Sequence, residues 1–282
     1  MSTIVWLLLC VGVASCGGDS QPTAPTPASS APPATATAAF SLQGDPESPQ
    51  GATWTYRGTF DGVAFDLQGI LLKPGGAGPF PAVIISHGAG GSAANYSRGV
   101  GVEMVRWGLV CIATNYTHAS GVPVGAPGTA AASDTGASQA NVQRAYAAHQ
   151  LLGQLGYVDM TRVAAHGHSM GAFVTAALAG AYPTSLRAAS HTAGGARPDG
   201  APGFAPMDAQ VRTIRTPYQM HHGDQDVVVA LSLDQRLDGI LQSSGVIREL
   251  FVYPGADHDD VSRDATMLAR VRAWYTTHGV LR

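Results

Sequence analysis

The sequence is short of charged residues, and above all of lysine. Only 12% of the 282 residues are Asp, Glu, Lys or Arg, and the formal net charge at pH 7 is -3. Lys73 is the single lysine among 16 basic residues. A chain with this balance has no excess of positive charge to attract phosphate groups. The composition therefore gives no reason to expect nucleic acid or an anionic membrane surface as a partner.

Cysteine is also rare, and the three residues of this type are Cys10, Cys16 and Cys111. Cys10 lies in an N-terminal segment that we expect to be removed. If Cys16 is acylated, no disulfide can form within one chain. Cys111 lies in the apolar run of residues 109–113. We therefore expect its thiol to behave as a small buried hydrophobic group.

The apolar run near the N-terminus, residues 4–13, is too short to span a bilayer. It ends in Val13-Ala14-Ser15-Cys16, which resembles the lipobox of bacterial lipoprotein signal peptides. No Lys or Arg precedes the run, a departure from that pattern. The resemblance implies a signal peptide over residues 1–15 and a lipid on Cys16. The protein is then expected to be exported and anchored in the bacterial cell envelope. An ordinary signal peptide with a secreted or periplasmic product is the alternative.

Residues 16–51 are rich in Pro, Thr, Ala and Ser. A segment of this composition cannot bury a hydrophobic core and is typical of a disordered tether. We therefore expect one folded domain over residues 52–282, separated from the lipidated cysteine by this spacer. The chain contains no internal repeat.

Beyond residue 52, apolar runs typical of strands alternate with segments of helical periodicity. Two β-rich runs are joined by Asp61-Gly62, which is a hairpin signal. The strands are expected at residues 53–60, 63–72, 81–86, 109–114, 163–166, 188–192, 217–221 and 246–253, and the helices at 93–107, 134–155, 172–181, 231–241 and 264–278. This alternation predicts an α/β fold with a mainly parallel sheet, helices on both faces and an antiparallel N-terminal hairpin.

One serine lies at the apex of a predicted strand–turn–helix unit. The turn is Gly167-His168-Ser169-Met170-Gly171, between the strand at residues 163–166 and the helix at 172–181. Gly167 and Gly171 lack a Cβ, so the strand and the helix can approach closely around the turn. Such a turn strains the serine backbone and lifts its hydroxyl clear of the sheet. The five-residue pattern alone is weak evidence in a glycine-rich chain, so its context decides.

A serine nucleophile needs a base to take its proton and an acid to orient that base. In an open α/β sheet such groups follow the carboxyl ends of strands. Asp224 and Asp226 follow the strand at residues 217–221, and His258 follows the strand at residues 246–253. The chain order is therefore Ser, Asp, His, with two candidates for the acid.

Four motifs, in this order along the chain, resemble those of the α/β-hydrolases. The closest resemblance is to the dienelactone-hydrolase-like and platelet-activating-factor-acetylhydrolase-like serine esterases. The motifs are Ser86-His87-Gly88-Ala89-Gly90-Gly91, the five-residue turn at Ser169, His222-Gly223-Asp224-Gln225-Asp226 and Gly255-Ala256-Asp257-His258. The resemblance covers nearly all of residues 52–282 and implies the α/β-hydrolase fold, with no cofactor and no metal.

By this resemblance Ser169 is the nucleophile, and His258 is first the general base and then the general acid. The family pattern places the orienting acid three residues after a glycine, which points from Gly223 to Asp226. Asp224 stays open as the second candidate; its other role is that of a residue that bonds the backbone of a turn.

Acyl transfer also requires hydrogen-bond donors for the developing oxyanion. The resemblance implies the backbone N–H groups of Met170, just after the nucleophile, and Ala89, just past His-Gly. Family lids are usually inserted near residues 193–215, and this stretch is too short for a cap of several helices. We therefore expect an open site covered by loops, chiefly residues 119–133 and 194–206.

The expected activity is hydrolysis of small or polymeric carboxylic esters by a secreted or lipid-anchored serine carboxylesterase. A serine peptidase related to the prolyl oligopeptidase catalytic domain is one alternative, although no β-propeller precedes the domain. A cutinase-like polyester hydrolase is another, although such enzymes carry a tryptophan where this chain has the stretch from His191 to Gly195. The third is a non-catalytic binding lipoprotein, which would be expected to have lost a catalytic residue. No compact motif supplies metal ligands.

Overall fold

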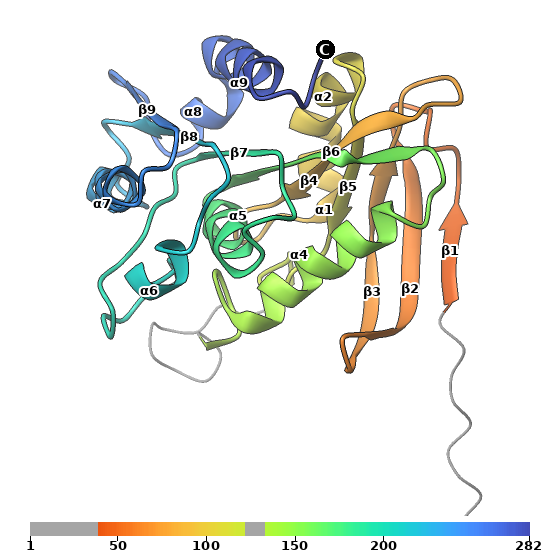
Figure 1. Ribbon diagram of the computed structural model, residues 1–282, viewed down its shortest axis with the longest axis horizontal. Coiled ribbons are helices and arrows are strands. Elements are labelled where there is room, and N and C mark those ends of the chain that lie inside the picture. The colour runs from red at the N-terminus through yellow and green to blue at the C-terminus, as the bar shows by residue number, and fades with distance from the viewer. Residues whose placement is uncertain (1–38, 122–132) are drawn as a thin grey trace, which may run out of the picture. The chain divides into compact units, whose positions relative to one another are not determined.

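The structure, a computed structural model, describes residues 39–121 and 133–282 (Figure 1). The expected signal peptide, the expected lipidation site Cys16 and the tether up to residue 38 lie outside the described residues. So do residues 122–132, which make up most of the loop expected to cover the site.

The described residues form one nine-stranded sheet in the order β1-β2-β3-β5-β4-β6-β7-β8-β9. The first three strands and β5 pair in antiparallel fashion, and all pairs from β5 to β9 are parallel. The mainly parallel sheet is therefore as predicted. The strands are β1 (Ala39–Gln43), β2 (Ala52–Phe60), β3 (Val63–Leu72), β4 (Phe80–Ser86), β5 (Val110–Thr114), β6 (Val158–His168), β7 (Ala188–Thr192), β8 (Tyr218–Gly223) and β9 (Arg248–Tyr253).

The predicted N-terminal hairpin is present, and its turn residues Asp61 and Gly62 have φ values of 49° and 79°. The hairpin is extended by β1, which pairs with β2 from Ala39 to Gln43. The composition predicts a tether over residues 16–51, but the structure places residues 39–51 in the edge strand and the turn that follows it. The ordered domain thus begins before residue 52, because backbone pairing with β2 orders a segment that buries little of its own surface.

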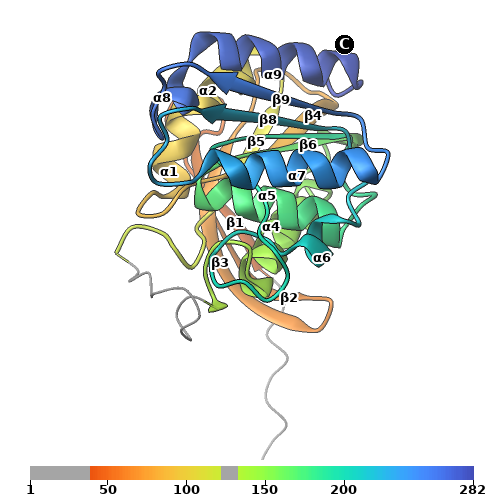
Figure 2. The same ribbon diagram turned by 90° about the vertical axis from the view of Figure 1, so that its left-hand side faces the viewer.

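Helices cover both faces of the sheet, as predicted (Figure 2). One face carries α4 (Gln139–Leu152), α5 (Met170–Ala181), α6 (Asp208–Val211) and α7 (Leu231–Ser243). The other carries α1 (Ala93–Tyr96), the π-helical turn η1 (Ser97–Gly101), α2 (Val102–Arg106), α8 (Asp260–Arg263) and α9 (Ala265–Thr277). The single helix predicted at residues 93–107 is thus helical throughout but contains a π turn.

Two apolar clusters hold these layers together. Alternate side chains of the central strands point to opposite faces, so that Ile84 and Ile112 pack toward α4 and α5 while Val83 and Ile85 pack toward α2 and α9. Cys111 is buried in the second cluster as a free thiol, as predicted. Burial of both faces explains why β4 and β5 are continuous apolar runs in the sequence.

The segment between β7 and β8 contains only the short helix α6 (Asp208–Val211) among the described residues. It therefore adds no large cap over the sheet, in agreement with the sequence. Within residues 39–121 and 133–282, none of the helices has the length and apolarity that crossing a membrane would require.

Candidate active site

Ser169 occupies a sharp turn between the end of β6 and the start of α5. Its backbone has φ 57° and ψ −122°, a combination that favours glycine. A Cβ on Gly167 would lie 2.2 Å from the carbonyl oxygen of Gly171, and a Cβ on Gly171 would lie 2.0 Å from that of Ser86. The close approach of strand and helix predicted from these two glycines is therefore present, and no other residue fits at either position.

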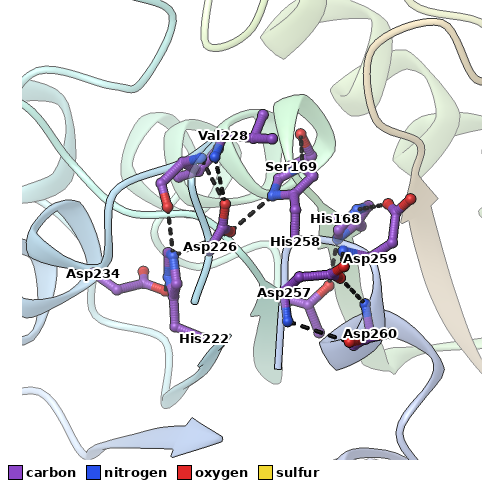
Figure 3. Close-up of polar contacts among 12 residues, drawn as sticks. His168, Ser169, His222, Asp226, Val228, Asp234, Asp257, His258, Asp259 and Asp260 are labelled. Atoms are coloured by element: carbon purple, nitrogen blue, oxygen red, sulfur yellow. Dashed lines mark hydrogen bonds and ion pairs between the residues drawn. The ribbon is translucent and has the colours of Figure 1, made fainter. Parts of the chain in front are cut away.

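Three of the predicted side chains form one chain of hydrogen bonds (Figure 3). The Oγ of Ser169 lies 2.9 Å from Nε2 of His258, whose Nδ1 lies 2.8 Å from Oδ2 of Asp226. The three residues come from the loops after β6, β9 and β8. The Asp226 side chain is fully buried, whereas 15% of the His258 side chain is exposed. The arrangement lets a base at Nε2 accept the serine proton while the carboxylate orients the ring.

Asp226 is held as a carboxylate by its surroundings. Its Oδ1 accepts hydrogen bonds from the N–H groups of Val228 and Val229, both at 2.8 Å. Burial raises the pKa of Asp226, but the hydrogen bonds from His258 and from these two N–H groups outweigh it, and the pKa lies below its ordinary value. Asp226 is thus ionised at neutral pH and accepts the Nδ1 hydrogen of His258.

Asp224, the second candidate for the acid, has a different environment. Its carboxylate accepts a hydrogen bond from the N–H of Gly255 at 2.8 Å, and its own N–H donates to the carbonyl of Tyr253. Asp224 is exposed and ties the loop after β8 to the loop after β9. It is placed as a turn-forming residue, and Asp226 is the carboxylate that meets His258.

The two backbone donors predicted for an oxyanion belong to segments next to Ser169. Met170 begins α5, where unpaired N–H groups and the helix dipole favour negative charge. A Cβ on Gly88 would lie 3.2 Å from the Cβ of Ser169, so the loop that carries Ala89 lies against the serine. Within the described part of the chain, the N–H groups of Ala89 and Met170 have no acceptor.

Two buried histidines fix the loop that carries Ala89. His87 accepts from the N–H of Tyr116 at Nε2 and donates from Nδ1 to Gly88, while His118 donates from Nε2 to the carbonyl of His87. The side chain of Asn141 on α4 donates to Nδ1 of His118. Burial lowers the pKa of His87, and burial together with His87 lowers that of His118 to about 4. Both rings are therefore neutral and structural at neutral pH.

His168, beside Ser169, packs the turn. Its Nδ1 lies 2.9 Å from Oγ1 of Thr192, and its ring lies 4.9 Å from that of His258. Burial, with a smaller effect of His258, lowers the pKa of His168 to about 4, despite Asp259 at 3.5 Å. His168 is therefore a neutral packing partner of His258.

The acidic residues that flank His258 are exposed and serve the local backbone. Asp257 accepts hydrogen bonds from the N–H groups of Asp259 and Asp260 just before α8. Across residues 39–121 and 133–282, no three His, Cys, Asp or Glu side chains converge to bind a metal ion. Burial raises the pKa of the Cys111 thiol, so this cysteine is not a nucleophile at neutral pH.

Sequence reasoning missed a buried ionisable cluster behind Asp226, made of His191, His222 and Asp234. The available signal was the spacing of Asp234, Leu237 and Leu241, which share the buried face of α7. An aspartate at such a position requires a partner inside the protein. The contact between His118 and Asn141 joins the loop after β5 to α4. No pattern in the sequence predicts this contact.

Comparison with known proteins gives the family and the fold. A sequence model of the dienelactone hydrolase family matches residues 67–278. No curated protein sequence matches this chain.

Solved structures share the fold at low sequence identity. An S-formylglutathione hydrolase from Agrobacterium tumefaciens has a TM-score of 0.62 and 16% identity, over 84% of this chain and 98% of its own. A thermophilic esterase from Thermogutta terrifontis has a TM-score of 0.58 and 18% identity, over 78% of this chain and 92% of its own.

Larger peptidases also share this fold. Dipeptidyl peptidase 4 of Porphyromonas gingivalis has a TM-score of 0.62 and 14% identity over 76% of this chain. This chain spans only about a third of the length of the dipeptidyl peptidase structures that it matches. The match over residues 67–278, together with the sheet order and the sharp turn at Ser169, shows that this chain is a member of the dienelactone hydrolase family with the α/β-hydrolase fold.

Proposed function

We propose that this protein is a serine hydrolase that cleaves carboxylic esters through an acyl-enzyme on Ser169. The observation that carries the proposal is the continuous chain of hydrogen bonds from Ser169 through His258 to Asp226. Its order along the sequence and its position at the carboxyl ends of parallel strands match the requirements of a nucleophile, a base and an orienting acid.

The chemistry follows from the positions of the donors and acceptors. Nε2 of His258 takes the hydroxyl proton as Oγ of Ser169 bonds to the ester carbonyl carbon. The negative charge that develops on the carbonyl oxygen faces the N–H groups of Ala89 and Met170. His258 then gives its proton to the departing alcohol, and a water molecule, activated by the same ring, releases the acid and regenerates the serine.

The surroundings of the site favour an ester with an apolar part. Val227 and Val228, directly after Asp226, are 95% and 68% exposed. Apolar side chains beside the catalytic acid offer surface to the acyl or alcohol group of a substrate. The T. terrifontis structure of similar fold is that of an esterase, which supports an ester as the substrate. The substrate is either a small molecule or a polymer.

The N-terminal pattern supports a location in the cell envelope. We propose that Cys16 is lipidated after removal of residues 1–15, so that the catalytic domain is held at a membrane. A secreted or periplasmic product of an ordinary signal peptide is the alternative.

A series of p-nitrophenyl esters from acetate upward tests the proposed activity on the full chain. The parent and Asp224→Ala are expected to turn over these esters, and Asp226→Ala is expected to lose about 10,000-fold in kcat because the ring of His258 loses its orientation. The acyl-chain profile reports the size of the pocket.

Absence of turnover on every ester, with the protein folded, would contradict the esterase proposal. The same protein should then be assayed with dipeptidyl p-nitroanilides, because the fold is shared with dipeptidyl peptidases. Cleavage of those substrates would identify it as a peptidase.

A further inference from the structure

A fully buried cluster of ionisable side chains lies directly behind the proposed catalytic acid. Asp234, in the first turn of α7, accepts from Nε2 of His191 at Oδ1 and from Nδ1 of His222 at Oδ2, both at 2.7 Å. None of the three side chains is exposed to solvent. A buried carboxylate is costly unless it is paired and hydrogen-bonded. The two histidines supply the hydrogen bonds that a buried Asp234 carboxylate requires.

The contacts of His222 indicate its charge. Its Nε2 lies 2.8 Å from the carbonyl oxygen of Val229, which can only accept, so Nε2 carries a hydrogen. Burial raises the pKa of Asp234, but the charges and hydrogen bonds of His191 and His222 outweigh it and hold that pKa well below its ordinary value. An ionised Asp234 can also only accept, so Nδ1 of His222 carries a hydrogen as well.

Both ring nitrogens of His222 are thus donors, which makes it an imidazolium. Burial lowers the pKa of His222, but the hydrogen bond and charge of Asp234 outweigh it, and the pKa lies above its ordinary value. The contacts of His191 do not require a second ring hydrogen in this way, because its Nδ1 lies 2.9 Å from the hydroxyl of Tyr218, which can donate as well as accept.

His222 meets the catalytic carboxylate in two ways (Figure 3). Its Nε2 lies 3.4 Å from Oδ2 of Asp226, the same oxygen that accepts from His258. Val229 connects the two residues a second time, because its carbonyl accepts from His222 while its N–H donates to Oδ1 of Asp226. The imidazolium therefore holds both the side chain and the loop of the acid.

We propose that His222, as an imidazolium paired with Asp234, is a positioning residue that fixes Asp226 against His258. The inference rests on the proposed function, since His222 acts only through Asp226. The pair carries no net charge, so it can hold the carboxylate at low cost in a site that excludes water. The charged groups that face the ring are the carboxylates of Asp226 and Asp234, and the titratable rings of His191 and His258 lie beyond them.

Two variants separate the contacts of the ring. In His222→Asn the amide can reach Asp234 in place of Nδ1, but the contact with Val229 is lost; in His222→Gln the amide can replace Nε2 but carries no charge. His222→Asn is expected to lower kcat for p-nitrophenyl acetate about 100-fold, because displacement of a catalytic group by about 1 Å has a cost of this size. KM should change little, and His222→Gln should retain more activity.

His149→Gln is the matched control. His149 lies on α4, outside this cluster. Like His222, it donates from Nε2 to a backbone carbonyl, in this case that of Ser185 at 2.9 Å. This variant should keep the kcat of the parent. An unchanged kcat in folded His222→Asn would overturn the proposal.

Nitrogen-15 NMR of the full chain, labelled at its histidine ring nitrogens, measures the charge of His222 directly. The His222 signals are assigned as those that disappear in His222→Gln. At about pH 7 the parent should show hydrogen on both ring nitrogens of His222, and Asp234→Asn should show one. A single hydrogen in the parent would overturn the proposal whether or not the protein cleaves esters.

The pH dependence of kcat gives a readout that a purely structural role would not produce. A raised pKa means that His222 keeps its proton to higher pH than a free histidine and loses it as the pH rises further. The parent should therefore lose activity at the alkaline end of its profile, and His222→Gln should lack that decline. A parent that turns over no ester would refute the proposed function, while the NMR result would still decide the charge of His222.

Discussion

The backbone of Ser169, with φ 57° and ψ −122°, occupies a region in which a side chain is strained. Strain of this kind costs about 1–3 kcal/mol and persists where the surrounding structure enforces it. The turn holds the serine Oγ 2.9 Å from Nε2 of His258. The position of the proposed nucleophile therefore carries a cost in stability.

Ser169→Gly should raise the free energy of unfolding by about 1 kcal/mol, while Ser169→Ala should leave it nearly unchanged. Glycine relieves the backbone strain. It also lowers the free energy of unfolding by about 0.4–1 kcal/mol, because the unfolded chain gains conformational entropy. Denaturant unfolding measures both changes, and both variants should lose ester turnover. Equal stability of the two variants would show that the strain is absent.

Single residues differed in how far the sequence could predict them. The spacing from Gly223 favoured Asp226 over Asp224, and the structure places Asp226 against His258. The contacts of His222 could not be predicted, because they join side chains from β8 and α7 that only the packed fold brings together. Local patterns report on turns and periodicity but not on such contacts.

At the scale of elements, the crossing of β4 and α5 determines where the proposed nucleophile lies. Gly171→Ala places a Cβ 2.0 Å from the carbonyl oxygen of Ser86, a backbone atom that cannot move aside. We expect a loss of about 3 kcal/mol in the free energy of unfolding, even though alanine favours a helix more than glycine does.

Gly239→Ala on α7 is the matched control for this prediction. A Cβ at Gly239 would meet no atom within 4 Å, so only helix propensity changes, and stability should rise by about 1 kcal/mol. Thermal or denaturant unfolding compares the two variants. If Gly171→Ala were as stable as the parent, the crossing would be looser than the structure indicates.

Most elements were predictable because their hydrophobic patterns are strong. The apolar runs of β4 and β5 and the Asp61-Gly62 turn predicted strands and a hairpin that the structure contains. The edge strand β1 was missed, because its residues are mostly exposed and gain order from backbone pairing with β2. The aromatic contact that β1 makes, between Phe40 and Trp54, also joins it to β2.

At the scale of the whole molecule, the parallel sheet gathers distant loops at one edge. Residues 89, 169, 226 and 258 each follow the carboxyl end of a strand, and the strand order β5-β4-β6-β7-β8-β9 brings those ends together. This convergence was predictable from the sequence. The alternation of strands and helices indicates an open α/β sheet, and in such a sheet the site lies at the carboxyl ends of the strands. The contacts that tune the site were not, because they depend on packing between layers.

Covalent labelling of the full chain with an alkyl fluorophosphonate tests the central claim most directly. Oγ of a serine activated by a base displaces fluoride from phosphorus, and peptide mass spectrometry locates the adduct. The account predicts one phosphonyl group, on Ser169, with no labelling of Ser169→Ala and slow labelling of Asp226→Ala. An adduct on another residue, or equal labelling of Ser169→Ala, would contradict it.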